Sequence, residues 1–373
     1  MKKSLFIIAS TALIISCASN DIKDDIAGND MPIGFSKVYI ENNTKAFATG
    51  AYTSSNFVNE GNTFGVFGYK NATTNNVKVF GERGNSEAEG VKVTYGTDWT
   101  YSPLRYWDKT ASSYNFYAYA PHSDNFTGTV ALASNSSNAF SISGFKQATT
   151  QPAMIDLMTD LTSKATVNSA STNPLGVNDV EFTFTHILSN INIIMAVSGD
   201  LKADYSDNPV IVNSVSIGAI KMDGEYGYDN GYKWVLTSPQ TTAATTFSAL
   251  QKKESNTAVF GSDELKASGQ NKTSTLADDK IGMTAVPGLT DLLFVPQAVD
   301  AAYAISVEYK IAGEVFNKTI LLSQFKKESA SLDTWEPGNK YNYVLVIGPT
   351  PILFDIKEIS GWGDGGTYTY VID

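Results

Sequence analysis

Cysteine and histidine are almost absent from this sequence. Its 373 residues contain one cysteine, Cys17, and two histidines, His122 and His186. A single thiol cannot form a disulfide within the chain, so packing and backbone hydrogen bonds must supply the stability of the folded part. Two histidines do not by themselves make a zinc site. We therefore expect no metal and no cofactor, although a structural calcium ion at an Asp-containing turn stays open.

Neither histidine has the surroundings of a catalytic group. His186 alternates with Phe182 and Phe184, which predicts a hydrogen-bonded structural histidine on a strand. His122 follows Pro121 in a turn-like segment, and we expect it at the surface. The G-x-S-x-G, P-loop and H-E-x-x-H motifs do not occur. A glycosidase would need a carboxylate pair, and nothing singles out two of the 38 acidic residues. The sequence therefore predicts no catalytic residues and no enzyme.

Positive charge is also scarce. The chain has 27 Lys and Arg against 38 Asp and Glu, for a formal net charge of −11. Nucleic acids and anionic lipid surfaces are bound by clustered Lys and Arg, and no such cluster occurs. The composition therefore argues against nucleic acid as a partner.

No apolar run is long enough to span a bilayer as a helix, which takes roughly 20 residues. Residues 5–15 are apolar and follow two lysines, as in the core of a secretion signal. The run ends in Ile-Ile-Ser-Cys at residues 14–17, which resembles a bacterial lipobox. We predict a signal peptide over residues 1–16 and lipidation, such as palmitate, at Cys17. The alternative is an ordinary signal with a chance cysteine.

A lipid anchor places the mature protein at a membrane. Two or three acyl chains hold a protein firmly where one does not. The acidic stretch at residues 21–25 resembles signals that send some lipoproteins of gut and oral diderm bacteria to the cell surface. We therefore expect a surface-exposed protein attached to the cell outer membrane through its lipid.

Aromatic residues and glycine are abundant instead, with 19 Tyr, 19 Phe and 29 Gly. Such a composition is typical of strands joined by turns. Only residues 151–164 have the pattern of a short helix. Period-two alternation or short apolar runs recur at residues 33–40, 63–70, 114–121, 180–197, 209–220, 292–297, 303–311, 315–323 and 341–348. Many short strands without intervening helices predict an all-β fold of antiparallel sandwiches.

The first predicted strand, residues 33–40, follows a polar tether. Its alternation predicts Ile33, Phe35, Lys37 and Tyr39 on one face. The length of the mature chain favours two domains. We place their boundary in the polar, aperiodic stretch at residues 163–179. Three units are expected. Residues 17–45 hold the tether and the first strand, residues 46–178 form an N-terminal β-sandwich, and residues 179–373 form a C-terminal β-sandwich.

Several short motifs occur in an order that covers nearly the whole chain. They are the lipobox at Cys17, "NNTKAFATG" (42–50), "GNTFGVFGY" (61–69), "LRYWDKTASSYNFYAYAP" (104–121), "VEFTFTHILSNINI" (180–193), "LLFVPQ" (292–297), "TWEPGNKYNYVLVI" (334–347) and "ISGWGDGG" (359–366). Together they resemble the fimbrillin family, which comprises the lipoprotein pilin precursors of type V pili and minor-fimbrium-like proteins. The resemblance implies two tandem transthyretin-like β-sandwich domains.

The resemblance also implies assembly by protease-triggered strand exchange. In related pilins a protease cuts after a basic residue, typically Arg, in the loop that follows the first strand. The corresponding bond here is Lys45-Ala46. Because a lysine stands where related pilins have arginine, the type of protease stays open, and so does whether the bond is cut at all. Loss of the first strand uncovers a groove that a strand from the next subunit fills. The candidate donor strand is 367–373, with Tyr368, Tyr370 and Ile372 on one face; the alternative is a last strand folded into its own domain.

Two functions of different classes are consistent with these features. The first is a structural subunit or tip adhesin of a surface pilus that mediates cell adhesion. Its partners would be other pilin subunits, in a homopolymer or heteropolymer, and a host or bacterial surface ligand. The alternative is a surface glycan-binding β-sandwich lipoprotein, which needs neither the loop at Lys45 nor an alternating C-terminal strand. Stalk, tip and anchor positions stay open.

Overall fold

The computed structural model describes residues 32–40, 62–71, 76–82, 87–108, 111–162, 164–166, 179–198, 211–228, 231–238, 240, 245–249, 280–286, 288–311, 314–327, 330–347 and 363–372. Within these ranges the chain forms strands joined by turns and a few 3-10 turns, without an α-helix. The prediction of an all-β fold is confirmed. The more specific arrangement of two tandem transthyretin-like sandwiches stays a prediction.

The prediction of a short helix within residues 151–164 is wrong. The chain forms a 3-10 turn, Gln151–Ala153, and then strand β9, Met158–Asp160. The apolar spacing that suggested a helix serves two different cores instead. Met158 is buried in the core of the first sheet, whereas Leu157 and Leu161 are buried in a second core. Tertiary packing therefore overrides the local pattern.

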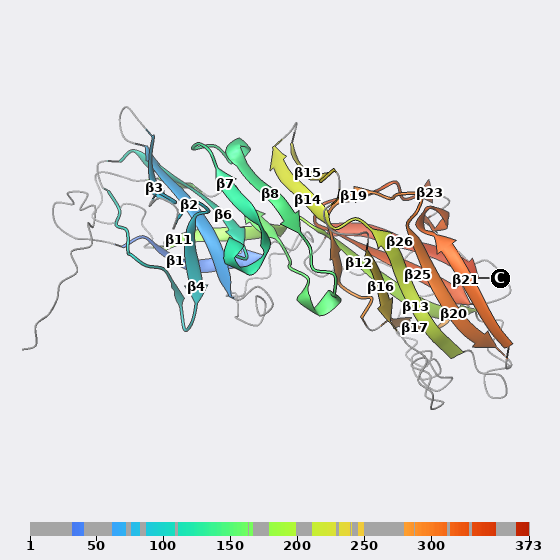
Figure 1. Ribbon diagram of the computed structural model, residues 1–373. Helices are drawn as coiled ribbons and strands as arrows, with labels where there is room; N and C mark the ends of the chain where they lie inside the picture. The colour runs from blue at the N-terminus through green and yellow to red at the C-terminus, as the bar shows by residue number, and fades with distance from the viewer. Residues whose placement is uncertain are drawn as a thin grey trace, which may run out of the picture.

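A nine-stranded sheet forms the N-terminal lobe, on the left of Figure 1. Its order is β1-β11-β9-β6-β2-β4-β5, with β10 paired to β6 and β3 paired to β2. Its strands are β1 (Gly34–Ile40), β2 (Thr63–Asn71), β3 (Asn76–Phe80), β4 (Val91–Tyr95), β5 (Trp99–Thr100), β6 (Ser113–Ala120), β9 (Met158–Asp160), β10 (Lys164–Thr166) and β11 (Asp179–His186). Strand β1 is thus at one end of the sheet and β5 at the other.

A four-stranded sheet lies between the two lobes, with the order β15-β14-β8-β7 (Figure 1). Its strands are β7 (Thr127–Leu132), β8 (Phe140–Lys146), β14 (Asp223–Tyr228) and β15 (Tyr232–Leu236). Two of its strands come from the first half of the chain and two from the second. The side chain of Gln147, just after β8, is buried and donates to the carbonyls of Ile155 (2.8 Å) and Leu293 (3.0 Å), which ties the two halves together.

The C-terminal lobe contains a seven-stranded sheet, a four-stranded sheet and a short two-stranded sheet. The seven-stranded sheet has the order β17-β12-β25-β26-β22-β23, with β18 paired to β12. Its strands are β12 (Ser189–Ser198), β17 (Lys280–Ala285), β18 (Leu292–Phe294), β22 (Lys326–Lys327), β23 (Ala330–Ser331), β25 (Asn339–Ile347) and β26 (Gly363–Ile372). The four-stranded sheet has the order β16-β13-β20-β21 and consists of β13 (Ile211–Ile220), β16 (Thr245–Ala249), β20 (Ala304–Ile311) and β21 (Glu314–Leu321). The two-stranded sheet pairs β19 (Gln297–Ala298) with β24 (Thr334–Trp335).

Buried side chains form two apolar cores. The first core lies within the nine-stranded sheet and contains Trp107, and the second contains Trp335 and extends from the middle sheet through the C-terminal lobe. Both tryptophans are almost fully buried, as expected for core residues. The second core also takes Phe67 and Tyr119 from strands β2 and β6. The two lobes therefore share packed side chains.

Strand pairing crosses the expected domain boundary near residue 178. Strand β11, which follows that boundary, pairs with β1 and β9 in the first sheet. Strand β14, from the second half, pairs with β8 from the first half. The division of the chain into units 46–178 and 179–373 stays a prediction, and the hydrogen bonds join the two units at these points.

The sequence predicts antiparallel sheets, but some of the strand pairs are parallel. Strand β1 runs parallel to β11, and β25 runs parallel to both β12 and β26. Each parallel pair joins strands whose chain connection passes through other elements or through residues outside the described ranges. The period-two pattern that predicts a strand carries no information on its direction.

Candidate functional site

The first strand, β1, occupies an edge of the nine-stranded sheet. Among the described strands it pairs with β11 alone, and the register shifts by one residue between Gly34 and Lys37. The side chains of Phe35 and Val38 in β1, and that of Ile33 just before it, are almost fully buried, with exposed fractions of 2%, 1% and 1%. The strict alternation predicted for this strand is therefore wrong, because the bulge turns Val38 to the buried face.

Five aromatic rings surround the side chain of Phe35, and we call them the cage. The ring centroids lie 5.5–6.2 Å from that of Phe35. The cage consists of Phe64, Phe80, Tyr101, Phe116 and Phe182. Four of the contacts are edge-on or tilted and the ring of Phe182 is stacked, arrangements that aromatic pairs favour. Phe35 is thus the main anchor of β1.

The segment 101–106, which follows β5, holds the start of β1, and we call it the clamp. The Tyr101 hydroxyl donates to the carbonyl of Ile33 at 2.7 Å, and the Ile33 N–H donates to the carbonyl of Arg105 at 2.8 Å. Pro32 forms an isolated antiparallel bridge with Tyr106. The clamp therefore binds both backbone groups of Ile33, the residue before β1, and it joins the two ends of the sheet.

Arg105 fixes the clamp to the body of the lobe. Its guanidinium donates to the carbonyls of Val79 (2.9 Å) and Pro103 (2.7 Å) and to the Glu87 carboxylate (2.5 Å), and it lies 5.1 Å above the ring of Phe80. The two charged side chains are only 12% and 9% exposed. Burial raises the pKa of Tyr101 to about 12, so its hydroxyl remains a donor across the physiological pH range. Arg105 therefore attaches the clamp to β3, through Val79, and to Glu87 before β4.

The side chains of Ile33, Phe35 and Val38 occupy an apolar site, which we call the groove, formed by the other residues of the first core. Burying an aliphatic or aromatic side chain stabilises a fold by about 1.5–3 kcal/mol, so the three buried residues contribute on the order of 5–9 kcal/mol before ordering costs. If β1 leaves, the cage is open to water and the edge of β11 loses its backbone partners. Such an edge is a template for another strand.

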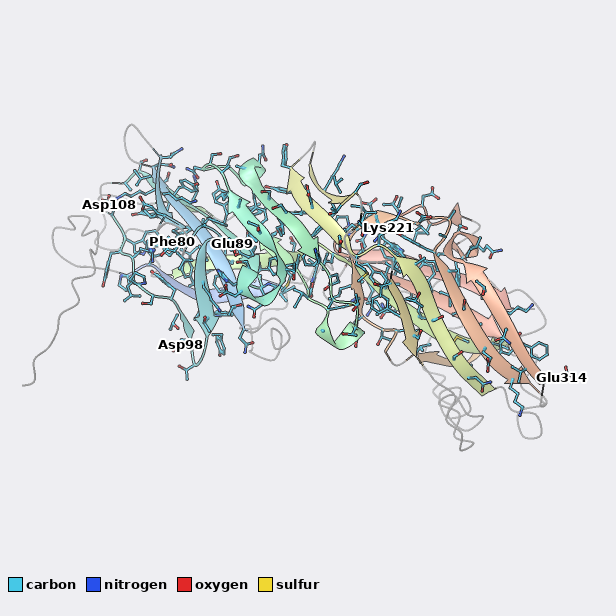
Figure 2. All side chains as sticks on the ribbon, in the orientation of Figure 1. Phe80, Glu89, Asp98, Asp108, Lys221 and Glu314 are labelled. Carbon is cyan, nitrogen blue, oxygen red and sulfur yellow. The ribbon has the colours of Figure 1, made fainter. Side chains whose placement is uncertain are left out.

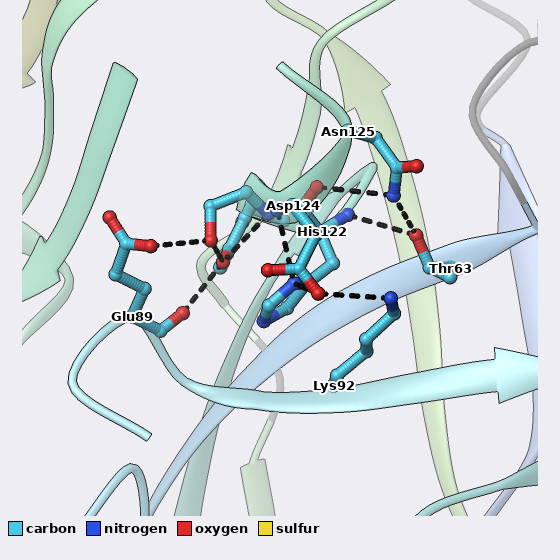
Figure 3. Close-up of polar contacts among 8 residues, drawn as sticks. Thr63, Glu89, Lys92, His122, Asp124 and Asn125 are labelled. Atoms are coloured by element: carbon cyan, nitrogen blue, oxygen red, sulfur yellow. Dashed lines mark hydrogen bonds and ion pairs between the residues drawn. The ribbon is translucent and has the colours of Figure 1, made fainter. Parts of the chain in front are cut away.

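A second polar arrangement lies at the end of β6, around His122 (Figure 3). The Lys92 ammonium contacts the Asp124 carboxylate at 2.9 Å, and the Asp124 N–H donates to His122 Nδ1 at 3.3 Å. The Ser123 hydroxyl donates to Glu89 Oε2 at 2.7 Å, and the Asn125 amide donates to the Thr63 hydroxyl at 2.7 Å. The network joins strands β2, β4 and β6 to the turn before β7.

This network holds the turn at residues 122–125 in place. The Ser123 hydroxyl is engaged by Glu89, and His122 Nδ1 accepts from a backbone N–H. His122 is buried, so the prediction of a surface position is wrong: the turn folds back over β2 and β4. Burial lowers the pKa of His122, with an opposing contribution from Asp124. Hydrogen bonding to Lys92 lowers the pKa of Asp124.

His186 is a structural residue, as predicted. Its Nδ1 lies 3.0 Å from Asp156 Oδ1, and its side chain is 7% exposed. It is the last residue of β11 and follows the part of that strand that pairs with β1. Its partner belongs to the chain just before β9, so the pair secures the β9–β11 contact.

The predicted site residues lie in different parts of the chain. Cys17, Lys45 and Ala46 are outside the described residues. Tyr368, Tyr370 and Ile372 belong to β26, whose backbone pairs with β25 from Asn339↔Gly363 to Ile347↔Ile372 and with β22 at one position. The structure therefore does not bring them near β1. In Figure 2 the cage residue Phe80 lies in one lobe, and Glu314, at the start of β21, lies at the far end of the other.

Sequence reasoning missed the cage and the clamp. Residue 35 contacts residues 64, 80, 101, 116 and 182, and one chain gives no signal for such distant contacts. The stretch "LRYWDKT" drew attention to Arg105 only as part of a family motif. Its ion pair with Glu87 could not be read from spacing.

The described residues contain neither a membrane-spanning helix nor a metal-binding cluster. No helix there has the length and hydropathy to cross a bilayer. No group of three or more His, Cys, Asp or Glu side chains there is arranged to hold a metal ion.

The fold and the site define an all-β protein that is completed at one edge by its own first strand. The chain belongs to the fimbrillin-like family, whose model matches residues 44–362. Strand β1 precedes the matched range.

Several solved structures are similar to this chain. A fimbrial protein from Bacteroides vulgatus has 23% identity and a TM-score of 0.49, over 85% of this chain and 95% of that one. A protein from Bacteroides uniformis named for cell adhesion has 16% identity and a TM-score of 0.40, over 77% and 86%. A protein from Bacteroides ovatus, also named for cell adhesion, has 13% identity and a TM-score of 0.39, over 86% and 93%. No curated protein matches this chain.

Proposed function

We propose that this protein is a structural, non-catalytic subunit or tip adhesin of a surface pilus, assembled by strand exchange between copies or with other pilin subunits. Membership of the fimbrillin-like family supports the pilus role. The observation that carries the exchange mechanism is the position of β1. It is an edge strand, it is the first strand described, and it fills an apolar groove.

Release of β1 requires a cut in the chain that follows it. We propose the bond Lys45-Ala46, five residues after the end of β1 at Ile40. After that cut β1 is held by the groove and the clamp alone. A strand from another copy can then compete for the same backbone edge and the same side-chain pockets.

The donor strand is proposed to come from the C-terminal end of the next subunit. Residues 367–373 carry Tyr368, Tyr370 and Ile372 at alternating positions. In the free subunit the backbone of β26 is paired with β25, so donation requires β26 to leave that edge. A stalk subunit would donate this strand, and a tip subunit would keep it.

Attachment to the cell is proposed to rest on the lipid at Cys17. We expect a Cys17→Ala variant to leave the outer-membrane fraction and collect in the soluble periplasmic fraction or be degraded. Palmitate labelling of the cells provides the direct readout. Unchanged membrane fractionation of the variant, without label, would remove the anchor from the proposal.

Limited trypsin digestion of the purified mature chain tests the exchange. We expect a product that begins at Ala46, followed by a ladder of higher species on electrophoresis without boiling. The matched control is Lys45→Ala, which should stay monomeric under the same conditions. If the Ala46 product forms and stays monomeric after β1 has dissociated, strand exchange is wrong and a lipid-tethered monomeric β-protein remains.

A further inference from the structure

Strand β21 is an edge strand with almost all of its side chains exposed. It stands last in the four-stranded sheet β16-β13-β20-β21 and, among the described strands, pairs with β20 alone. Of its eight residues only Ile320 is buried, and the other seven are exposed. Its first residue, Glu314, lies at the far end of the C-terminal lobe (Figure 2). The outer backbone edge of β21 is therefore a template for a further strand.

The sequence of β21 does little to prevent such pairing. Edge strands of monomeric proteins are commonly protected by bulges, prolines or charges. β21 contains no proline, and its register with β20 runs without a shift over the whole length of the strand. It also carries three of the eight large apolar side chains that are exposed in the described part of the chain, namely Val315 (51%), Phe316 (36%) and Leu321 (39%). Such an exposed apolar edge favours a partner strand.

The two charges of β21 select one way for two copies to pair. In an antiparallel pair about a two-fold axis, one residue lies opposite itself, and residues equally far on either side of it lie opposite each other. With Phe316 at the axis, Glu314 of each copy lies opposite Lys318 of the other, so opposite charges meet twice. With Lys318 at the axis two lysines lie opposite each other, which is unfavourable. With Asn317 at the axis no opposite charges meet.

The aromatic side chains of β20 and β21 agree with the axis at Phe316. Tyr309 on β20 lies opposite Phe316, and the two rings stack with centroids 5.3 Å apart and an interplanar angle of 19°. Pairing at this axis places the second copy's Phe316 on the other side, at the Cβ separation of roughly 4.5–5.5 Å that neighbouring antiparallel strands impose. A row of aromatic rings then crosses both strand pairs, and contacts between such rings are favourable.

We propose that β21 pairs with β21 of a second copy of this chain, antiparallel about a two-fold axis at Phe316, so that two four-stranded sheets join into one continuous sheet. The ladder covers residues 314–318 of each copy, because Glu314 is the first residue of the strand. So short a ladder makes a small interface, and we expect a weak, reversible dimer. The contact uses neither the groove of β1 nor the C-terminal tail, so it does not depend on the proposed strand exchange.

Two variants with complementary charges test the pairing. The protein is the full mature chain with Cys17→Ser and Lys45→Ala, which removes the thiol and the proposed cut, so that β1 stays in place. Sedimentation equilibrium over a wide range of concentrations gives the dissociation constant of the dimer. Glu314→Lys places a lysine opposite Lys318, and Lys318→Glu places a glutamate opposite Glu314. Both positions are exposed, and urea unfolding checks that the variants fold as the parent does.

Each variant alone should bind itself at least about tenfold more weakly than the parent, because two attractive pairs become two repulsive ones. An equal mixture of the two variants restores both attractive pairs and should form a heterodimer about as tight as the parent dimer. The matched control is Lys233→Glu on β15, which makes the same change of net charge at an exposed residue of another sheet and should change the constant by less than about twofold.

Three results would overturn the proposal. They are a parent chain that is monomeric at every concentration, single variants that dimerise as tightly as the parent, and a mixture that associates no better than its two components. The first two exclude β21 as the contact, and the third excludes the axis at Phe316. None of them bears on strand exchange, because the chain used here is not cut.

Discussion

The anchor role of Phe35 yields the most direct test of the groove. Phe35→Ala removes a ring that is 2% exposed and has five aromatic neighbours. Truncation of a buried phenylalanine destabilises a fold by about 3–5 kcal/mol, which is more than half of the stabilisation worked out above for Ile33, Phe35 and Val38 together. We therefore expect the variant to hold β1 only marginally while the rest of the sheet stays folded.

Hydrogen exchange followed by mass spectrometry locates the effect. Amides of β1 and of the facing edge of β11 should exchange more than about a hundredfold faster in Phe35→Ala, whereas amides of β25 should not change. Urea unfolding gives the total loss of stability. The matched control is Phe316→Ala on β21, where a phenylalanine that is 36% exposed stacks on Tyr309 at 5.3 Å and should cost about 1 kcal/mol. If the two variants lose equal stability, or if exchange rises evenly across both lobes, Phe35 is not the anchor of a separable strand.

Three further predictions concern the clamp and the network at the end of β6. Tyr101→Phe removes the hydrogen bond to the Ile33 carbonyl and the one accepted from the Arg105 N–H, and should cost about 0.5–1.5 kcal/mol for each. We expect faster exchange at the start of β1 and at Arg105, and equal protection in both proteins would contradict this. Glu87→Leu leaves the nearly buried Arg105 without its carboxylate and should cost about 2–4 kcal/mol in urea unfolding, which a second change, Arg105→Met, should largely restore. Burial lowers the pKa of His122, so below about pH 6.5 the unfolded chain binds more protons than the folded chain. The stabilisation from the neutral imidazole is therefore present above that pH and is lost as the pH falls towards the folded pKa. We expect the stability of His122→Asn, measured by urea unfolding from pH 7 to 5, to fall less steeply than that of the parent chain.

Most strands could be predicted from the sequence because each has its own alternation. The segments at residues 63–70, 303–311 and 341–348 became β2, β20 and β25 with ends within two residues of the prediction. Strand β14 pairs with β15, the strand that follows it in the chain. Local pattern decides these elements because the side-chain period of a strand is fixed by its backbone.

The pairing between strands could not be predicted in the same way. The partners β8 and β14 are far apart in the chain, and so are β1 and β11. The register shift in β1 leaves both Phe35 and Val38 buried, in a core that other strands help to build. The turn that contains His122 is likewise held by distant residues, because the His122 N–H donates to the Thr63 hydroxyl and the neighbouring Ser123 hydroxyl donates to Glu89. Sequence pattern thus predicted the elements, and tertiary contacts decided the site.

The interleaved middle sheet has a mechanical consequence for a subunit under tension. Its strands β7 and β8 come from one half of the chain and β14 and β15 from the other, and they lie side by side between the lobes (Figure 1). A pull that separates the lobes must break the β8–β14 ladder together with the Gln147 hydrogen bonds, rather than stretch a linker. Such a subunit bears load as one stiff rod, and in a pulling experiment its two lobes should rupture in a single event.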